Sequence, residues 1–484
     1  EQRPQTKRQH ICVVGAGIIG LSTAKSLRDR GYSVTVLASE HPICPTSTSQ
    51  GAGGLWIPFR CEPKELVTKW AIETLKEYIS YVNTKKSFAE IVSVIELFNI
   101  NENEEKTIPE WHNLSTFLNF QCLTLSELIE LGHGKSGSYE WSIDDESNHQ
   151  TTKTETIMKA PYYCWDRDTI PKGWLKYSNC FLFHSITINS PEYLSYLLDI
   201  FDKDPHVDVR IGSEYYFQTL HDASIYAYDT LKCDALINCT GLGAGALCSD
   251  RELVAGRGGI AMFKRRKLTS SNNTPTAPTV NSTLQSWETN VVVLTGEAPL
   301  GSDNEPAYVI PRGDVIVVGG TVTLQPAKYE NNINDLEYNN TNVHDEINTE
   351  ELNRLFRNFK ELSFRKNTNA TDTTVVIDGD EGPGGGSIRN RTVEIDDDNS
   401  IRDTFEGTWI GKRPIRESVR IEWEESKEGL PRCYPLPILH NYGHGGAGWS
   451  IHVGTSEHVC GLLDCFMACQ DSNNPITTPL TPRL

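Results

Sequence analysis

The sequence predicts an α/β fold, in which a Rossmann-like dinucleotide-binding domain is joined to a second domain with a mixed sheet. Three observations support this prediction. A short apolar segment, residues 10–14, leads directly into a GxGxxG motif at 15–20. Helical spacing of apolar residues follows, and a second β-rich segment occupies residues 33–38. Strand, glycine turn, helix and strand in this order form the beginning of a βαβ unit.

Each of these first elements rests on a local pattern. The run HICVV at 10–14 has the length of a buried strand, and SVTVLA at 33–38 is rich in β-branched residues. Between the two strands, Leu21, Ala24 and Leu27 recur at helical spacing. We therefore expect the helix to pack this face against the strands.

The rest of the chain is less regular. Further strands are predicted for the apolar segments 234–239, 289–294 and 307–318, and a helix for 458–467. Polar segments rich in Asn, Thr, Asp and Gly are expected to be surface insertions, namely 99–106, 269–282, 329–350 and 367–403.

Composition limits the classes of function. The chain has 484 residues, enough for two or three domains, and a net charge of −19. This charge disfavours a nucleic-acid binder, which needs a concentrated positive field. No apolar window is long enough for a membrane span. The 13 cysteines predict reduced thiols, and Cys460, Cys465 and Cys469 are expected in a helical core, so no metal site is expected.

The glycine motif carries the first chemical prediction. Gly15 permits a tight turn, Gly17 lets a pyrophosphate approach the backbone, and Gly20 lets the helix pack close to the strand. The helix N-terminus favours the phosphate charge. Glu40, just beyond the second strand, is suited to accept hydrogen bonds from ribose hydroxyls.

The fold alone leaves FAD and NAD open. The segment TSTSQGAGGLW at 46–56 is polar, then glycine-rich, then apolar. Such a segment lets the backbone approach a planar ring system, which favours FAD, although a plain loop competes with this interpretation. An NAD-dependent dehydrogenase and a non-catalytic nucleotide-binding protein remain the alternatives from other classes.

The order of several motifs resembles the D-amino-acid oxidase family. RPIR and HNYGHGGAG together are the most specific part of the resemblance, which excludes the polar insertions. The motifs are VVGAGIIGLSTA, GAGGLWIPF, NCTG, AYVIP, KRPIR and HNYGHGGAG, at 13–24, 51–59, 238–241, 307–311, 412–416 and 440–448.

The resemblance implies an FAD-binding domain and a set of residues along the cofactor. This set comprises Gly15, Ala16, Gly17, Ile18, Gly20, Ser39, Glu40, Thr48, Ser49, Gly53, Gly54, Leu55, Thr240, Gly241, Gly445, Gly446, Ala447, Gly448, Trp449 and Ser450. A helix near His458 is expected to direct its positive end at the flavin.

The resemblance also implies how an amino acid would bind. Arg413 would pair with the substrate carboxylate, the Tyr308 hydroxyl would assist, and the Gly446 carbonyl would accept from the amine. A planar guanidinium suits a carboxylate because it binds both oxygens. No acid–base residue is implied, since the protein positions the substrate and FAD carries the chemistry. His444 is less favoured as a catalytic group, and Arg416 and Arg420 are expected to be structural.

Departures from the family narrow the substrate. Asn304 replaces a second tyrosine in the expected lid at 296–306. Phe59 and Val322 replace the histidine and arginine of the D-aspartate branch. We therefore expect oxidation of neutral or basic D-amino acids by O2, giving H2O2. The alternative is a related flavin amine oxidase that acts on D-aspartate, glycine or sarcosine.

Domain organisation and location complete the expectations. The FAD-binding domain is expected to comprise 1–48, 190–262 and 415–484, and the substrate domain 49–189 and 263–414. The tail Pro482-Arg483-Leu484 resembles a peroxisomal signal; without it, the cytoplasm is expected. The expected partners are a D-amino acid and O2, and a homodimer is one assembly that the sequence leaves open.

Overall fold

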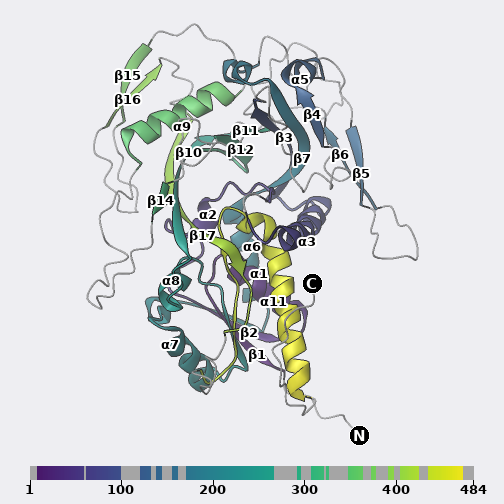
Figure 1. The fold of residues 1–484 in the computed structure, drawn as a ribbon, viewed down its shortest axis with the longest axis vertical. Coiled ribbons are helices and arrows are strands. Elements are labelled where there is room, and N and C mark those ends of the chain that lie inside the picture. The colour runs from purple at the N-terminus through teal and green to yellow at the C-terminus, as the bar shows by residue number, and fades with distance from the viewer. Residues whose placement is uncertain are drawn as a thin grey trace.

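In the computed structural model, a mixed sheet lies above a smaller parallel sheet, and helices pack around both (Figure 1). The described residues are 8–58, 61–99, 120–131, 138–143, 155–161, 170–265, 291–295, 307–320, 323–325, 347–363, 372–377, 391–396, 404–424 and 434–471. The expected insertions fall largely outside them, although two strands within 367–403 pair as a hairpin: β15 (Asp372–Ile377) and β16 (Arg391–Asp396).

The first sheet is parallel and has the strand order β18-β9-β1-β2-β8. Its strands are β1 (His10–Val14), β2 (Ser33–Ala38), β8 (Val207–Ile211), β9 (Ala235–Asn238) and β18 (Ile438–His440). The predicted bounds of the first two strands are confirmed. Because helices cover both faces, the inner strands β1, β2 and β9 are almost continuously buried, whereas the edge strand β8 alternates apolar and charged residues.

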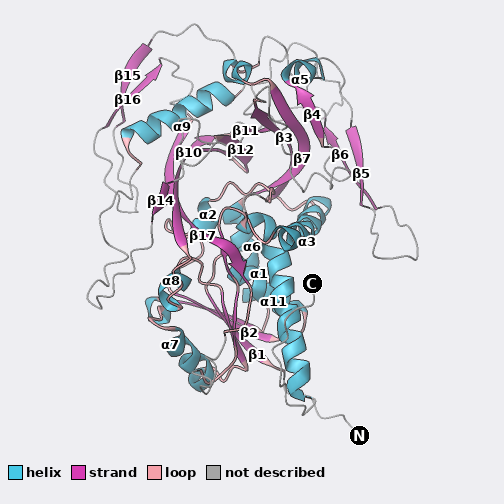
Figure 2. Cartoon of the chain, in the orientation of Figure 1, coloured by secondary structure: helices cyan, strands magenta, loops and turns pink. Residues whose placement is uncertain are grey.

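Successive residues of β1 pack into different cores. Ile11 and Val13 contact the helices α1 (Ile18–Asp29) and α11 (Gly448–Asp471) through the larger core. Cys12 and Val14 belong to a separate core on the side of α7 (Leu220–Ile225) and α8 (Gly243–Leu247). Figure 2 shows these helices on opposite sides of the sheet.

The second sheet is mixed, with the order β19-β17-β10-β13-β12-β11-β3-β7-β4 and β14 paired to β10. Within the described part of this sheet, β11 and β3 pair in parallel and the other neighbours pair antiparallel. Its strands are β3 (Ala89–Phe98), β4 (Gln121–Thr124), β7 (Asn179–Ile188), β10 (Val254–Lys264), β11 (Val291–Thr295), β12 (Tyr308–Arg312), β13 (Val315–Gly319), β14 (Thr323–Gln325), β17 (Phe405–Arg420) and β19 (Tyr442–His444). The predicted combination of a Rossmann-like unit and a mixed sheet is confirmed.

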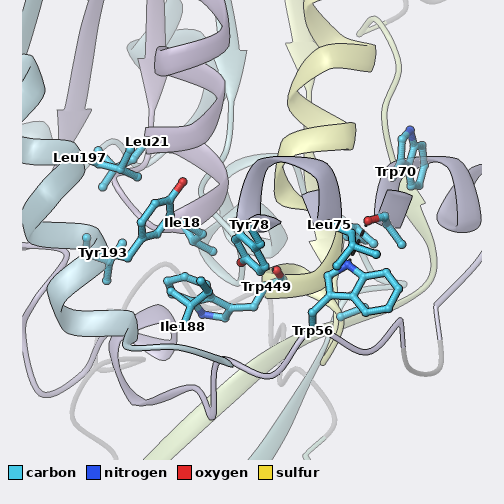
Figure 3. Packing of buried hydrophobic residues seen from close by; sticks show 14 of the residues in the cluster. Ile18, Leu21, Trp56, Trp70, Leu75, Tyr78, Ile188, Tyr193, Leu197 and Trp449 are labelled. Carbon is cyan, nitrogen blue, oxygen red and sulfur yellow. Dashed lines mark hydrogen bonds between the residues drawn. The ribbon is translucent and has the colours of Figure 1, made fainter. Parts of the chain in front are cut away.

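The mixed sheet separates two environments. On one face, α9 (Thr349–Leu362) covers the strands, and its Phe359 ring stacks on Phe263 of β10 at a centroid distance of 3.9 Å. The opposite face turns toward the parallel sheet. There the largest core gathers side chains such as Trp56, Tyr193 and Trp449 between α1, α6 (Ser190–Asp202), α11 and α3 (Lys64–Asn83) (Figure 3).

Several local predictions need correction. Residues 307–318 form a hairpin and not one strand, because Gly313 adopts φ +56 between β12 and β13. The C-terminal helix begins at Gly448, well before 458. Cys460 is buried as expected, but Cys465 is exposed because one side of this long helix faces solvent.

The proposed domain boundaries stay a prediction. Every strand of the parallel sheet comes from the three segments assigned to the FAD-binding domain. Residues 254–262 and 415–420 of the same segments pair within the mixed sheet as parts of β10 and β17.

Two further hairpin strands and several short helices lie around these layers. They are β5 (Ser138–Ile143), β6 (Glu155–Pro161), α2 (Thr48–Gly51), α5 (Leu125–Leu131), η3 (Lys172–Lys176), η4 (Ser213–Tyr215) and η5 (Tyr226–Thr230). Among the described residues, no helix combines the length and apolar character that crossing a bilayer requires.

Candidate cofactor and substrate site

The glycine turn after β1 leaves no room for side chains. Gly15 adopts φ +107, and a Cβ there would overlap the backbone of Cys239. A Cβ on Gly20 would overlap the carbonyl of Gly15. The turn is therefore packed between α1 and the end of β9, where Thr240 and Gly241 follow.

The N-terminus of α1 faces a hydroxyl from α2. The amide of Ile18 donates to Ser49 Oγ at 3.0 Å, and a Cβ on Gly17 would lie 3.2 Å from the same atom. The structure thus brings the first glycine motif and the predicted second segment together. Free amide groups at this helix end are suited to an anion.

Ser39 and Glu40 follow β2 at the same edge of the sheet, since the carboxyl ends of parallel strands meet there. Glu40 is exposed, and its Oε2 accepts from Thr46 Oγ1 at 2.7 Å. Its carboxylate is therefore available near the turn, as a ribose-binding acid must be. That role stays a prediction.

Residues 48–55, the glycine segment, lie across the face of the mixed sheet opposite α9. Thr48 Oγ1 donates to the Lys412 carbonyl at 2.8 Å, and the indole of Trp409 packs against Gly51. Gly53 lies over Ile310 of β12. Gly54 (φ +71) accepts from the amide of Ile188, beside the bridge between Leu55 and Thr187. Glycines are needed here because the backbone touches the sheet directly.

A second loop, residues 445–447, reaches the same place from the C-terminal side. The Gly445 amide donates to the Pro414 carbonyl at 2.8 Å, and α11 begins directly after Ala447. The helix N-terminus is thus at Gly448 and not near His458, so its positive end lies at this loop.

Two residues of the first turn of α11 tie the loops together. Trp449 Nε1 donates to the Ser49 carbonyl at 3.1 Å. Ser450 Oγ donates to the Ile57 carbonyl at 2.7 Å and accepts from the Ile57 amide at 2.9 Å. The predicted cofactor residues from both ends of the chain therefore meet.

Strand register places the predicted substrate residues on this same face. Tyr308 is opposite Gly319, and a Cβ on Gly319 would overlap the Tyr308 ring. The ring therefore extends from β12 over β13, in the direction of β17. Because paired residues share a face, Tyr308, Trp409 and Arg413 all face the glycine segment.

Arg413 carries a buried guanidinium nitrogen that lacks a partner. Its Nη1 is buried without a hydrogen bond, and no carboxylate among the described residues pairs with it. Its Cδ lies 3.8 Å from the position of a Cβ on Gly446, so the predicted carboxylate and amine partners are neighbours. An unpaired buried guanidinium Nη is costly unless an acceptor binds.

His444 is a poor proton acceptor in this position. It is 3% exposed, and burial lowers its pKa to about 3. Its Nε2 is buried without a partner. The imidazole is therefore neutral at physiological pH and poorly suited to take up a proton during catalysis.

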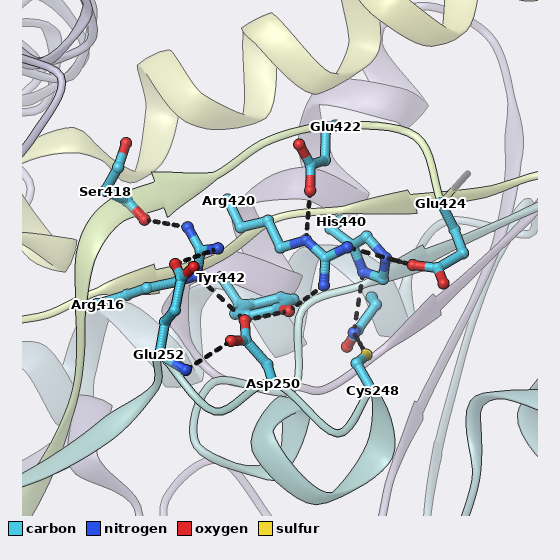
Figure 4. Close-up of polar contacts among 11 residues, drawn as sticks. Cys248, Asp250, Glu252, Arg416, Ser418, Arg420, Glu422, Glu424, His440 and Tyr442 are labelled. Atoms are coloured by element: carbon cyan, nitrogen blue, oxygen red, sulfur yellow. Dashed lines mark hydrogen bonds and ion pairs between the residues drawn. The ribbon is translucent and has the colours of Figure 1, made fainter. Parts of the chain in front are cut away.

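The neighbouring arginines of β17 are structural, as expected (Figure 4). Arg416 Nε bonds Asp250 Oδ2 at 3.1 Å, and Arg420 Nη1 donates to Tyr442 Oη at 2.6 Å. Tyr442 Oη in turn donates to Asp250 at 2.8 Å. This network joins β17 and β19 to the end of α8 and so supports the strand that carries Arg413.

Two residues that contact the glycine segment, Trp409 and Arg312, were not predicted from the sequence. Trp409 is an isolated aromatic residue in a strand, and Arg312 is the last residue of a strand, before a glycine, so neither has a distinctive local signal. The expected lid at 296–306 with Asn304, together with Phe59, Val322 and the C-terminal tail, lies outside the described residues.

The site fits a dinucleotide with a planar ring. The turn has no room for a side chain at Gly15 or Gly20, and a helix N-terminus follows it. The glycine segment contacts the strand that carries the unpaired Nη1 of Arg413. Comparisons with known proteins decide between FAD and NAD. Residues 10–135 match the family model described as FAD dependent oxidoreductase.

This chain carries an FAD-dependent oxidoreductase domain and is similar to D-amino-acid oxidases over most of its length. Its cofactor is FAD. A D-amino-acid oxidase of Dictyostelium discoideum is 26% identical over 94% of this chain and 91% of its own length. Human D-aspartate oxidase is 22% identical over 95% of this chain and 96% of its own length.

Solved structures show the same fold for this oxidoreductase. Glycine oxidase from Geobacillus kaustophilus superposes with a TM-score of 0.56 at 12% identity, covering 95% of each chain. L-proline dehydrogenase from P. horikoshii gives a TM-score of 0.55 at 12% identity, covering 95% of this chain and 94% of its own. The fold thus spans nearly the whole oxidoreductase.

Proposed function

We propose that this oxidoreductase converts neutral or basic D-amino acids and O2 to 2-oxo acids, ammonia and H2O2, with one water consumed. The observation that supports the proposal is Arg413, whose buried Nη1 has no partner among the described residues and lies beside the segments predicted to bind FAD. A substrate carboxylate would supply the missing charge and hydrogen bonds. When bound, FAD supplies the hydride acceptor and returns the electrons to O2.

Three points of attachment would set the stereochemistry. Arg413 would hold the carboxylate, the Tyr308 hydroxyl would donate to it, and the Gly446 carbonyl would accept from the amine. With carboxylate and amine fixed, only one enantiomer can present its Cα–H to the cofactor side. His444, neutral and deeply buried, is not needed as a base.

The decisive test is an anaerobic visible spectrum of the purified holoprotein before and after addition of D- or L-amino acids. We expect the flavin band to bleach with D-alanine or D-arginine and to persist with the L-enantiomers. A band that persists with all of them would contradict the proposal.

A second candidate is oxidation of D-aspartate, glycine or sarcosine. It is favoured by the similarity to human D-aspartate oxidase and to a glycine oxidase structure. Bleaching by one of these compounds, with neutral and basic D-amino acids inert, would select it.

The tail Pro482-Arg483-Leu484 leads us to propose a peroxisomal location. A fluorescent protein that carries this tail should enter peroxisomes, and removal of the last three residues should abolish entry. Uniform cytoplasmic fluorescence of the intact fusion would argue for the cytoplasm.

A further inference from the structure

Arg312 is a buried arginine that faces backbone carbonyls and no carboxylate. Its exposed fraction is 5%, and it ends β12 on the face that also carries Tyr308 and Ile310. Among the described residues, no Asp or Glu forms an ion pair with it. Burial lowers the pKa of its guanidinium to about 10, so the group keeps its charge at neutral pH.

The guanidinium binds backbone carbonyls of the glycine segment from the side of the mixed sheet. Nη1 donates to the carbonyl of Ala52, and lies 3.3 Å from both the Gln50 carbonyl and Ser190 Oγ. Ser190 Oγ also donates to the Ala52 carbonyl, at 2.8 Å. Nε is buried without an acceptor. The Ala52 carbonyl therefore receives two donors, of which only one is charged.

The opposite end of this peptide points away from the arginine. In a planar trans peptide the C=O and N–H are antiparallel, so the Gly53 N–H is directed away from Arg312. Among the described residues, no acceptor is bonded to this N–H. A cation at the carbonyl polarises the peptide and makes its N–H a stronger donor. The positive potential of Arg312 is thus extended to the side of the segment that faces away from it.

A buried cation without a counter-ion is unfavourable unless negative charge develops nearby. FAD gains negative charge when it is reduced, and the glycine segment lies along the predicted FAD site. We propose that Arg312 is a positioning residue that fixes segment 50–54 for FAD, and that its charge, acting through the Ala52–Gly53 peptide, favours the reduced cofactor over the oxidised one.

The test compares Arg312→Met with Arg312→Lys in the full chain. FAD affinity is measured by adding FAD to the apoprotein and following flavin fluorescence, and the midpoint potential by dye-equilibrated reductive titration of the holoprotein. Arg312→Met should weaken FAD binding at least tenfold. It should also lower the ratio of reduced to oxidised cofactor at least tenfold at a fixed potential, which is a decrease of about 30 mV for a two-electron couple.

Arg312→Lys separates charge from shape. All three contacts come from Nη1, at the end of the arginine side chain, and the lysine side chain is one bond too short to place its Nζ there. FAD binding should therefore weaken, while the retained charge should keep the midpoint potential near the wild-type value. If Arg312→Met does not fold, Arg312→Lys decides alone: weakened FAD binding with a native potential supports the proposal, and native FAD binding overturns it.

Ser190→Ala is the matched control, because it removes the neutral donor from the same Ala52 carbonyl. It should leave the potential unchanged. An equal drop in potential for Ser190→Ala and Arg312→Met would overturn the role of the charge, as would a native potential in Arg312→Met. Neither titration contains an amino acid, so the result is independent of the proposed substrate.

Discussion

Replacement of Arg413 by alanine tests the proposed substrate clamp most directly. The side chain contributes a charge and a planar pair of donors, and no protein carboxylate competes for it among the described residues. Alanine would leave a bound carboxylate without its charged partner. FAD should still bind, because the cofactor contacts predicted from the sequence do not include this residue.

The expected size of the effect follows from the exposure of Arg413. Removing one partner of a buried hydrogen-bonded ion pair costs about 3–5 kcal/mol. Since Arg413 is only half-buried, the lower limit applies. At 1.36 kcal/mol for each tenfold change, about 3 kcal/mol corresponds to a decrease in kcat/KM of roughly 100-fold. Arg413→Lys keeps the charge but loses the fork, and should lose about tenfold.

The assay is oxygen uptake with the D-amino acid that bleaches the flavin band most rapidly. Arg416→Ala is the matched control on the same strand, since Arg416 is already paired with Asp250; it should lower stability and change KM little. A kcat/KM of Arg413→Ala within threefold of wild type, with FAD bound, would refute the clamp. So would an equal loss in Arg416→Ala.

Three further results are expected. Gly15→Ala should lower Tm and weaken FAD binding at least tenfold, because its Cβ would overlap backbone at φ +107; native FAD affinity would contradict this account of the turn. Tyr442→Phe removes the hydroxyl that donates to Asp250 and accepts from Arg420, and should cost about 1–3 kcal/mol in urea unfolding, whereas an unchanged midpoint would show that the network contributes little. Burial lowers the pKa of His444 to about 3 and of His452 to about 4. Between these values and about 6.5 the unfolded chain binds more protons than the folded one, so stability should fall with falling pH by up to about 1.4 kcal/mol per pH unit for each histidine. Urea midpoints at pH 7 and pH 5 that coincide would contradict the burial of these imidazoles.

Local chemistry explains why the N-terminal unit was predictable. The bounds of β1 and β2 agree with the sequence prediction, because periodicity and the glycine turn act over a few neighbouring residues. The start of α11 was missed because Gly448 and Gly454 resemble loop residues. The structure shows why glycine is needed within the helix: a Cβ on Gly454 would overlap the backbone of Trp70 in α3.

By itself, the sequence determined the α/β class, the glycine turn, and the segments that resemble FAD and substrate sites, because each depends on residues close together in the chain. Only the tertiary structure decided how these segments meet. It places Arg413 without a protein partner, and Arg312 beneath the carbonyl of Ala52, a residue 260 positions earlier in the chain. Such contacts depend on sheet register and side-chain burial, which local sequence patterns do not encode.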